Sequence, residues 1–272
     1  MDFAHRPAFA YRAIRQVSRT PALRWGFSLG VTLGLWWFVA WAAHLPPFIL
    51  PTPDRVARRA WVAIQSGVLV RHTAYTLLEV LSGLALGLLT AVLLGYLLSR
   101  SRTLEQLLSP YIVASQSIPI VAIAPLLIIW FGSGLLSKVL IGALIVFFPM
   151  LVNTLVGLHH VPTELRDLMR SLGATSWQTL RYLEVPAALP VVLGGLRISA
   201  TLSVIGAVVG EFVAADRGLG FLINLARGRY DTPMVFVAVL TLIGMALALY
   251  GLAVALERRL LSWQRHDASR AL

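Results

Sequence analysis

Ionisable side chains inside apolar stretches are the residues of this sequence with the clearest potential for chemistry. Arg197 and Glu211 share one apolar stretch, and Glu79 opens another. Charged groups are costly in such surroundings, so each is a candidate functional group. Arg197 could attract an anionic substrate, but we favour a pairing with Asp167 or with free backbone carbonyls. For Glu211 we favour a structural or gating role, and we expect Glu79 to face the membrane interface.

Motifs for catalysis or metal binding are missing from the sequence. His159 and His160 precede Glu164, but a zinc site needs three or four ligands, so we expect an interfacial histidine pair instead. The chain has no cysteine, which excludes disulfides and thiolate chemistry. It also lacks a phosphate-binding loop: its single lysine, Lys138, follows Ser137 in what we interpret as a short outer loop. We therefore expect no metal and no cofactor on this chain.

The polar segment 159–190 predicts a first short helix that ends in a tight turn. Pro162 suits the first turn of a helix, and Gly173 is placed to end that helix in a left-handed conformation. Between them the apolar residues follow helical spacing, which predicts one apolar stripe: Leu165, Leu168, Met169 and Leu172.

A second short helix follows the turn. Thr175 and Gln178 fit a capping box at its start, and Pro186 and Pro190 mark the entry to the next apolar stretch. An amphipathic helical hairpin of this kind is typical of a docking element that fits a groove of a partner protein.

The elements that position these residues are membrane helices. Hydrophobic residues make up 58% of the 272 residues and charged residues only 13%, too few to cover a soluble domain of this size. A net charge of +11 would suggest nucleic acid in a soluble protein. Here we expect basic loops beside anionic lipid headgroups of the bilayer and no nucleic-acid partner.

Six stretches are long and apolar enough to span a membrane, so we predict an all-α, polytopic fold with six transmembrane helices. The predicted spans are 27–43, 76–98, 110–131, 139–158, 188–212 and 232–256. They form one transmembrane domain over 27–256, between a basic N-terminal segment, 1–26, and a basic tail, 257–272.

The distribution of arginine and lysine predicts the orientation. With both termini in the cytoplasm, the inner segments hold 14 basic residues and the outer segments 8. Basic residues favour the inner side, so the bias places segment 159–190 in the cytoplasm as well.

The N-terminal region leaves two alternatives open. The first span carries three tryptophans after a basic lead, which favours a retained anchor, although Ala40-Trp41-Ala42 resembles a signal-peptide cleavage site. Residues 54–66 form an amphipathic pattern, with Val56, Ala57, Ala60, Trp61 and Ile64 on one face. This pattern predicts a helix on the outer membrane surface, and the alternative is a simple connector.

Two spans carry small residues at every fourth position, which lets helix backbones approach closely. The stripes are Gly83, Gly87, Ala91 and Gly95 on the second span, and Gly195, Ser199, Ser203 and Ala207 on the fifth. The third span carries Pro110, Pro119 and Pro125, which predict bends within it.

The polar segment resembles the EAA loop of ABC importer permeases: Glu-Ala-Ala, three residues, Gly, nine residues and Ile-x-Leu-Pro. Counted from Gly173, the acid of the pattern falls on Asp167, although Asp replaces Glu and Leu-Met replaces the two alanines. The resemblance implies that an ATPase contacts this loop, with these residues as its coupling site: Glu164, Asp167, Leu168, Met169, Leu172, Gly173, Ala174, Leu183 and Pro186.

The resemblance extends over roughly residues 50–260 and is strongest to the nitrate/taurine/alkanesulfonate branch. It rests on Leu50–Pro53, Pro125–Gly132, Phe147–Pro149 with Asn153-Thr154, Ser171–Ala174, Gly195–Ile198 and Gly218–Gly220. It implies a subunit of the bacterial inner membrane that works with ATPase subunits, a second permease copy, as in a homodimer, and an extracytoplasmic substrate-binding protein. Closure of the ATPases would then rock the spans between inward-open and outward-open states.

Polar residues in the spans are candidates for the translocation path, with interhelical hydrogen bonding as the alternative for each. They are Ser115, Gln116, Asn153, Arg197, Ser199, Ser203 and Glu211. The branch implies a small anion as substrate, such as an alkanesulfonate, taurine or nitrate. An importer for a thiamine-precursor-like heterocycle is the alternative. A secondary transporter and a membrane-embedded hydrolase are less favoured, because we find no internal repeat and no catalytic motif.

Overall fold

The structure is a computed structural model that describes residues 21–42, 46 and 48–262. Most of the basic N-terminal segment, 1–26, and part of the tail, 257–272, lie outside the described residues. Every regular element in the described part of the chain is helical. The prediction of an all-α fold is confirmed.

Four helices are long and apolar enough to cross a membrane. They are α4 (Val68–Ser99), α7 (Leu135–His159), the continuous helix Ser176–Val213 that ends in α10 (Val185–Val213), and α12 (Thr232–Leu260). A shorter apolar helix, α2 (Pro21–Ala42), precedes them. The protein is therefore a multi-pass membrane protein, as predicted.

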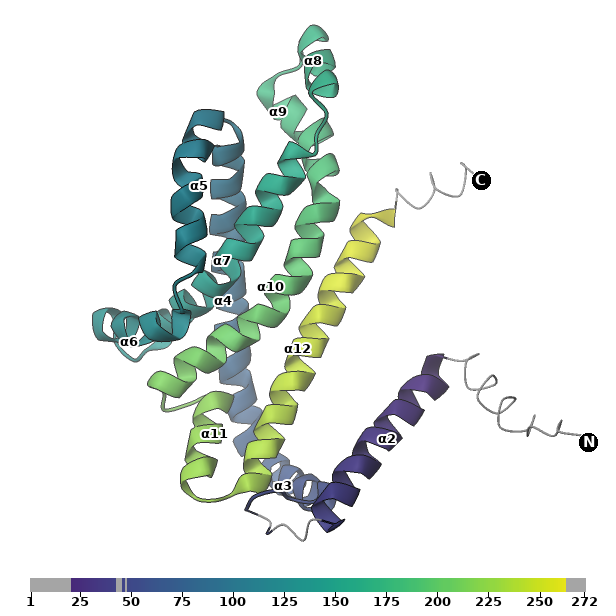
Figure 1. Ribbon diagram of the computed structural model, residues 1–272, viewed down its shortest axis with the longest axis vertical. Coiled ribbons are helices and arrows are strands. Elements are labelled where there is room, and N and C mark those ends of the chain that lie inside the picture. The colour runs from purple at the N-terminus through teal and green to yellow at the C-terminus, as the bar shows by residue number, and fades with distance from the viewer. Residues whose placement is uncertain (1–20, 43–45, 47, 263–272) are drawn as a thin grey trace, which may run out of the picture.

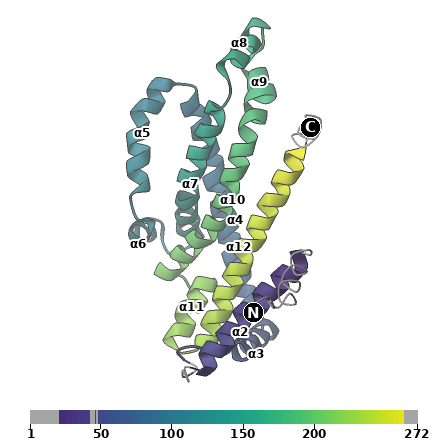
Figure 2. The same ribbon diagram turned by 45° about the vertical axis from the view of Figure 1, so that its right-hand side comes forward.

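The third predicted span, 110–131, is not one straight helix. It is divided between α5 (Arg102–Gln116) and α6 (Ile120–Phe131), which are bent by 95° at the break that contains Pro119. Pro119 has no backbone N–H and disfavours a helical conformation in Ile118, so the helix ends here. In Figures 1 and 2, α6 lies across the direction of α5. The described residues thus contain four spans, or five if the bent pair counts as one.

The centre of the bundle is the contact of α7 with α4 and α10. Along α4 the four residues of the predicted stripe are buried and face α7, and along α10 the second stripe is buried as well. In the first stripe, a Cβ atom on Gly87 would lie 2.7 Å from the carbonyl oxygen of Ala143 on α7. Beside the second stripe, a Cβ atom on Gly206 would lie 2.7 Å from the Cα atom of Gly142. Only glycine permits this approach, so the predicted role of the small residues in helix packing is confirmed.

Two short helices cover one end of the bundle. α3 (Pro53–Gln65) packs Val56 and Ala63 inward, and α11 (Leu219–Gly228) contacts α10 and α12. Arg59 of α3 forms an ion pair of 2.7 Å with Asp231, which precedes α12. The amphipathic helix is therefore confirmed, and its position on the outer membrane surface stays a prediction.

The bundle has two distinct ends, which we call the α11 end and the α8 end. α3 and α11 lie at the first, and α8 (Thr163–Ser171) and α9 (Ser176–Thr179) project from the second (Figures 1 and 2). α2 runs toward the α11 end, and α12 runs back toward the α8 end. That the α8 end faces the cytoplasm stays a prediction.

Candidate functional site

The predicted turn at Gly173 is present and joins α8 to α9. Gly173 has a φ of 71°, the left-handed conformation that glycine adopts without strain. The Ala174 N–H donates to the Met169 carbonyl over 3.0 Å, and the Gly173 N–H donates to the Arg170 carbonyl over 3.0 Å. These bonds satisfy carbonyls at the end of α8, as a Schellman motif does. The local sequence therefore fixes this turn.

The second helix begins as predicted but continues further. The Gln178 side chain accepts from the Thr175 N–H over 2.7 Å, and the Thr175 hydroxyl accepts from the Gln178 N–H, which completes the capping box. The predicted entry near Pro186 agrees with the start of α10 at Val185, but no break separates α10 from the second short helix, because the helix is continuous from Ser176 to Val213. A π-helical turn, η1 (Leu180–Glu184), precedes Pro186. Such a turn widens the backbone where proline removes a donor and crowds the preceding carbonyl.

The hairpin presents an exposed apolar surface. Leu172 at its tip is 72% exposed, and four other large side chains of the hairpin and η1 are exposed too: Leu165, Leu168, Trp177 and Tyr182. Asp167 is also exposed and pairs only locally, with Arg170 at 3.2 Å. Of the other predicted coupling residues, Glu164 is exposed, and four are half-buried: Met169, Ala174, Leu183 and Pro186. Several exposed large apolar side chains on one short, projecting hairpin indicate an interaction surface.

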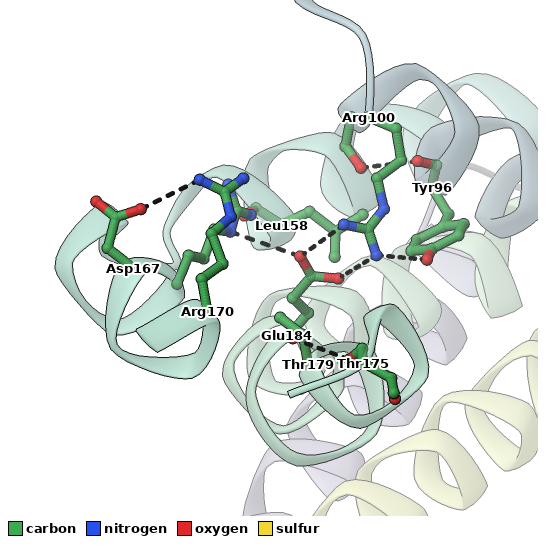
Figure 3. A network of polar contacts seen from close by, with 10 residues as sticks. Tyr96, Arg100, Leu158, Asp167, Arg170, Thr175, Thr179 and Glu184 are labelled. Carbon is green, nitrogen blue, oxygen red and sulfur yellow. Dashed lines mark hydrogen bonds and ion pairs between the residues drawn. The ribbon is translucent and has the colours of Figure 1, made fainter. Parts of the chain in front are cut away.

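Glu184 holds this hairpin to the bundle and was missed by the sequence analysis. Its carboxylate is 4% exposed and lies 3.0 Å from the Arg100 Nη2 atom and 3.5 Å from the Arg166 Nε atom. Arg166 also donates to the Leu158 carbonyl over 2.8 Å, and Arg100 donates to the Tyr96 hydroxyl (Figure 3). The carboxylate therefore joins α8, the end of α4 and η1 at one point.

The histidines at the end of α7 bind other protein groups. The His159 Nε2 atom lies 3.3 Å from the Glu105 Oε2 atom of α5, and the His160 Nδ1 atom contacts the Val156 carbonyl at 2.7 Å. Among the described residues no three His, Cys, Asp or Glu side chains form a group that could hold a metal.

The uncharged path candidates lie in two places. Ser115 and Gln116 belong to α5, where Ser115 is half-buried and Gln116 is exposed. Asn153 of α7 packs against Gly195 of α10, and two other α10 residues are fully buried: Ser199 and Ser203. Ser203 donates to the Ala200 carbonyl, and the Ser199 hydroxyl has no partner among the described residues. The structure brings the α7 and α10 residues together and leaves the α5 residues apart, and a path role for each stays a prediction.

Arg197 has a different partner from the one predicted. It forms an ion pair with Glu257 near the end of α12, not with Asp167. Asp167 is held out on α8, whereas α12 runs alongside α10 (Figure 1). The pair neutralises the arginine within the bundle and ties α12 to α10.

The remaining span charges gather near the α11 end. Glu211 accepts from the Thr76 hydroxyl over 2.6 Å and from the Gly220 N–H. Glu79 is buried rather than at the interface, and it lies 3.1 Å from the Lys138 Nζ atom. Lys138 is likewise not in a loop: it belongs to the first turns of α7 and is buried. This cluster holds the α10–α11 connection against α4, which agrees with a structural role for Glu211.

The sequence of residues 83–262 matches the family described as binding-protein-dependent transport system inner membrane components. The chain belongs to this family. Within it, the chain is 51% identical over 244 residues to the riboflavin transport system permease protein of Chloroflexus aurantiacus, covering 90% of this chain and 91% of the relative. It is therefore a permease-type membrane subunit.

Other relatives of the chain are named for different substrates. The chain is 36% identical to the formylaminopyrimidine permease of Halalkalibacterium halodurans, over 80% of this chain and 87% of that one. It is 34% identical to the taurine permease of Escherichia coli, over 87% and 88%. The inward-facing methionine ABC transporter has the same fold, with a TM-score of 0.61 at 21% identity over 72% of this chain and 97% of that one. The prediction of an ABC importer permease is confirmed, whereas the nitrate/taurine/alkanesulfonate branch is not singled out.

Proposed function

We propose that this chain is the permease subunit of an ABC importer for an aromatic heterocycle of the flavin or pyrimidine type. The observation that carries the proposal is the 51% identity to a riboflavin permease over nine tenths of the chain. The 36% identity to a formylaminopyrimidine permease supports the same class of substrate. The heterocycle thus replaces the small anion as the favoured substrate.

A small anion, such as taurine, an alkanesulfonate or nitrate, is the second candidate. The relatives that favour it are the taurine permease and a Bacillus subtilis aliphatic sulfonate permease, which is 30% identical. The ion pair of Arg197 with Glu257 weighs against it, because the arginine that was to attract the anion is neutralised by a carboxylate.

The energy source that we propose is a separate ATPase that binds ATP with its magnesium and docks on α8 and α9. The exposed apolar side chains of the hairpin supply the contact surface, and Asp167 and Glu164 supply charge at its edge. The Glu184 contacts with Arg100 and Arg166 would transmit a movement of α8 to α4 and α10, because they join these helices directly.

A second copy of this chain and an extracytoplasmic binding protein complete the proposed importer. α5 has no buried residue in the single chain, and several of its apolar side chains are exposed: Leu107, Tyr111 and Val113. A second copy packed against α5 and α6 would cover these side chains and place Ser115 and Gln116 beside the path. The α11 end would then receive the binding protein from outside the inner membrane.

The test is substrate uptake in a strain that lacks its own riboflavin, pyrimidine and taurine uptake systems. The full-length chain is expressed together with ATPase and binding-protein genes from its own organism, and uptake of each labelled compound is measured. We expect uptake of riboflavin or formylaminopyrimidine and none of taurine. Taurine uptake alone would refute the heterocycle proposal, and uptake that persists when the ATPase loses its catalytic residue would refute the ATP-driven mechanism.

A further inference from the structure

A cavity of about 590 Å³ lies at the α8 end, beside the coupling hairpin but apart from its exposed apolar surface. Its walls come from the end of α4, the start of α5, the end of α7 and the start of α8. Five of the lining side chains are ionisable: Arg100, Arg102, Glu105, His159 and Arg166.

The charges around the cavity do not balance. One carboxylate, Glu184, serves both Arg100 and Arg166, and Glu105 is engaged by His159. Arg102 is exposed and has no ion-pair partner among the described residues. Three guanidinium groups therefore share two carboxylates, which leaves an excess positive charge. An anion is the complementary ligand.

The donors of the cavity match a phosphate group. The N-terminus of α8 lies in its wall at Thr163, and the residue that precedes it, Pro162, offers no side chain to cap the first-turn N–H groups. A helix N-terminus with free N–H groups favours an anion. The Arg166 Nε atom is buried and lies 3.5 Å from the Glu184 carboxylate, without a hydrogen bond among the described residues, so Glu184 neutralises this guanidinium only in part because it also serves Arg100. A planar guanidinium group can bind a phosphate group through two parallel N–H···O hydrogen bonds.

We propose that this cavity binds a phosphate-bearing anion, which joins Arg102 on α5 to the start of α8. The ligand is either the headgroup of an anionic phospholipid or a free phosphate compound, since both present the same charged oxygens. α5 has no buried residue and few contacts with the rest of the chain, so an anion shared with α8 would fix its position. The occupant would thereby link the position of α5 to the hairpin that receives the ATPase.

Binding to the purified full-length chain tests the proposal. Inorganic phosphate is titrated and followed by calorimetry in detergent at low salt, and retention of phosphatidylglycerol is compared with that of phosphatidylcholine by native mass spectrometry. The test variant is Arg102→Gln, because Arg102 is exposed and its loss leaves the Glu184 contacts intact. The matched control is Arg181→Gln, an exposed arginine of η1 that does not line the cavity.

We expect phosphate or phosphatidylglycerol to bind the wild type, and Arg102→Gln to weaken this binding about tenfold through the loss of one charge-assisted contact. Arg181→Gln should bind as the wild type does. Binding of phosphate alone identifies a soluble ligand, and selective retention of phosphatidylglycerol identifies a lipid. The proposal is overturned if neither ligand binds, if Arg102→Gln binds normally, or if both variants weaken binding equally.

Discussion

Replacing Glu184 with glutamine should loosen the coupling hairpin from the bundle. The substitution keeps the shape of the side chain but removes the charge that two guanidinium groups share, on Arg100 and Arg166. Both arginines then lose the only carboxylate that pairs with them among the described residues. The position of that carboxylate is almost closed to solvent, so water cannot fully replace it.

The magnitude follows from how far each partner is buried. Breaking a fully buried ion pair costs about 3–5 kcal/mol. The Arg100 and Arg166 side chains are 39% and 27% exposed, so water takes over part of the lost interaction. We therefore expect a loss of about 1–2 kcal/mol in the free energy that holds α8 against the bundle. This corresponds to roughly a five- to thirtyfold change in the equilibrium between bound and released α8.

The assay compares Glu184→Gln with Asp167→Asn, which removes the acid at the motif position. Asp167 is exposed and pairs only with Arg170, so its replacement should leave the melting temperature of the purified chain unchanged. Glu184→Gln should lower that temperature and increase proteolysis within 163–175. A melting temperature that falls more in Asp167→Asn than in Glu184→Gln would refute this reasoning.

Three other perturbations have distinct expected outcomes. Gly173→Val puts a β-branched residue at a φ of 71°, which strains the turn between α8 and α9. ATP-driven uptake should therefore be lost while membrane insertion persists. Uptake at the wild-type rate would contradict the coupling role. Lys138→Met leaves the Glu79 carboxylate buried without its cation, so the yield of folded protein should fall. Adding Glu79→Gln should restore the yield. A double variant that yields no more folded protein than Lys138→Met alone would contradict the pairing. Gly206→Leu forces side-chain atoms into α7 and should destabilise the chain by about 1–3 kcal/mol. Gly244→Leu places its side chain in open space and should not destabilise the chain. Equal melting temperatures of the two variants would refute the close helix contact.

Local chemistry in the coupling hairpin was predictable from the sequence. The turn at Gly173 and the capping box at Thr175 depend on residues within a few positions of each other, and both are present as predicted. The stripes of small residues were equally predictable, because their spacing alone shows which face of a helix can approach another.

Long-range pairings were not predictable in the same way. Glu184 and Arg100 are 84 positions apart, and nothing in either local sequence indicates the partner. The placement of Lys138 in a loop was wrong, because Glu79 on the neighbouring helix compensates the charge and allows the lysine to lie buried in α7. Pro119 predicted the bend between α5 and α6, whereas the angle of 95° could not be read from the position of the proline.

Cross-linking at Leu172 tests the central claim, that the loop around Gly173 receives the ATPase. The chain has no cysteine, so Leu172→Cys introduces a single thiol at the exposed tip of the hairpin, and Ile49→Cys places one at the α11 end, where the side chain is 53% exposed. Each variant is labelled with a maleimide-linked photo-cross-linker in membranes that contain the assembled transporter. We predict a covalent product with the ATPase from Leu172→Cys and none from Ile49→Cys. A product from Ile49→Cys alone, or from neither variant, would contradict the docking of the ATPase at this loop.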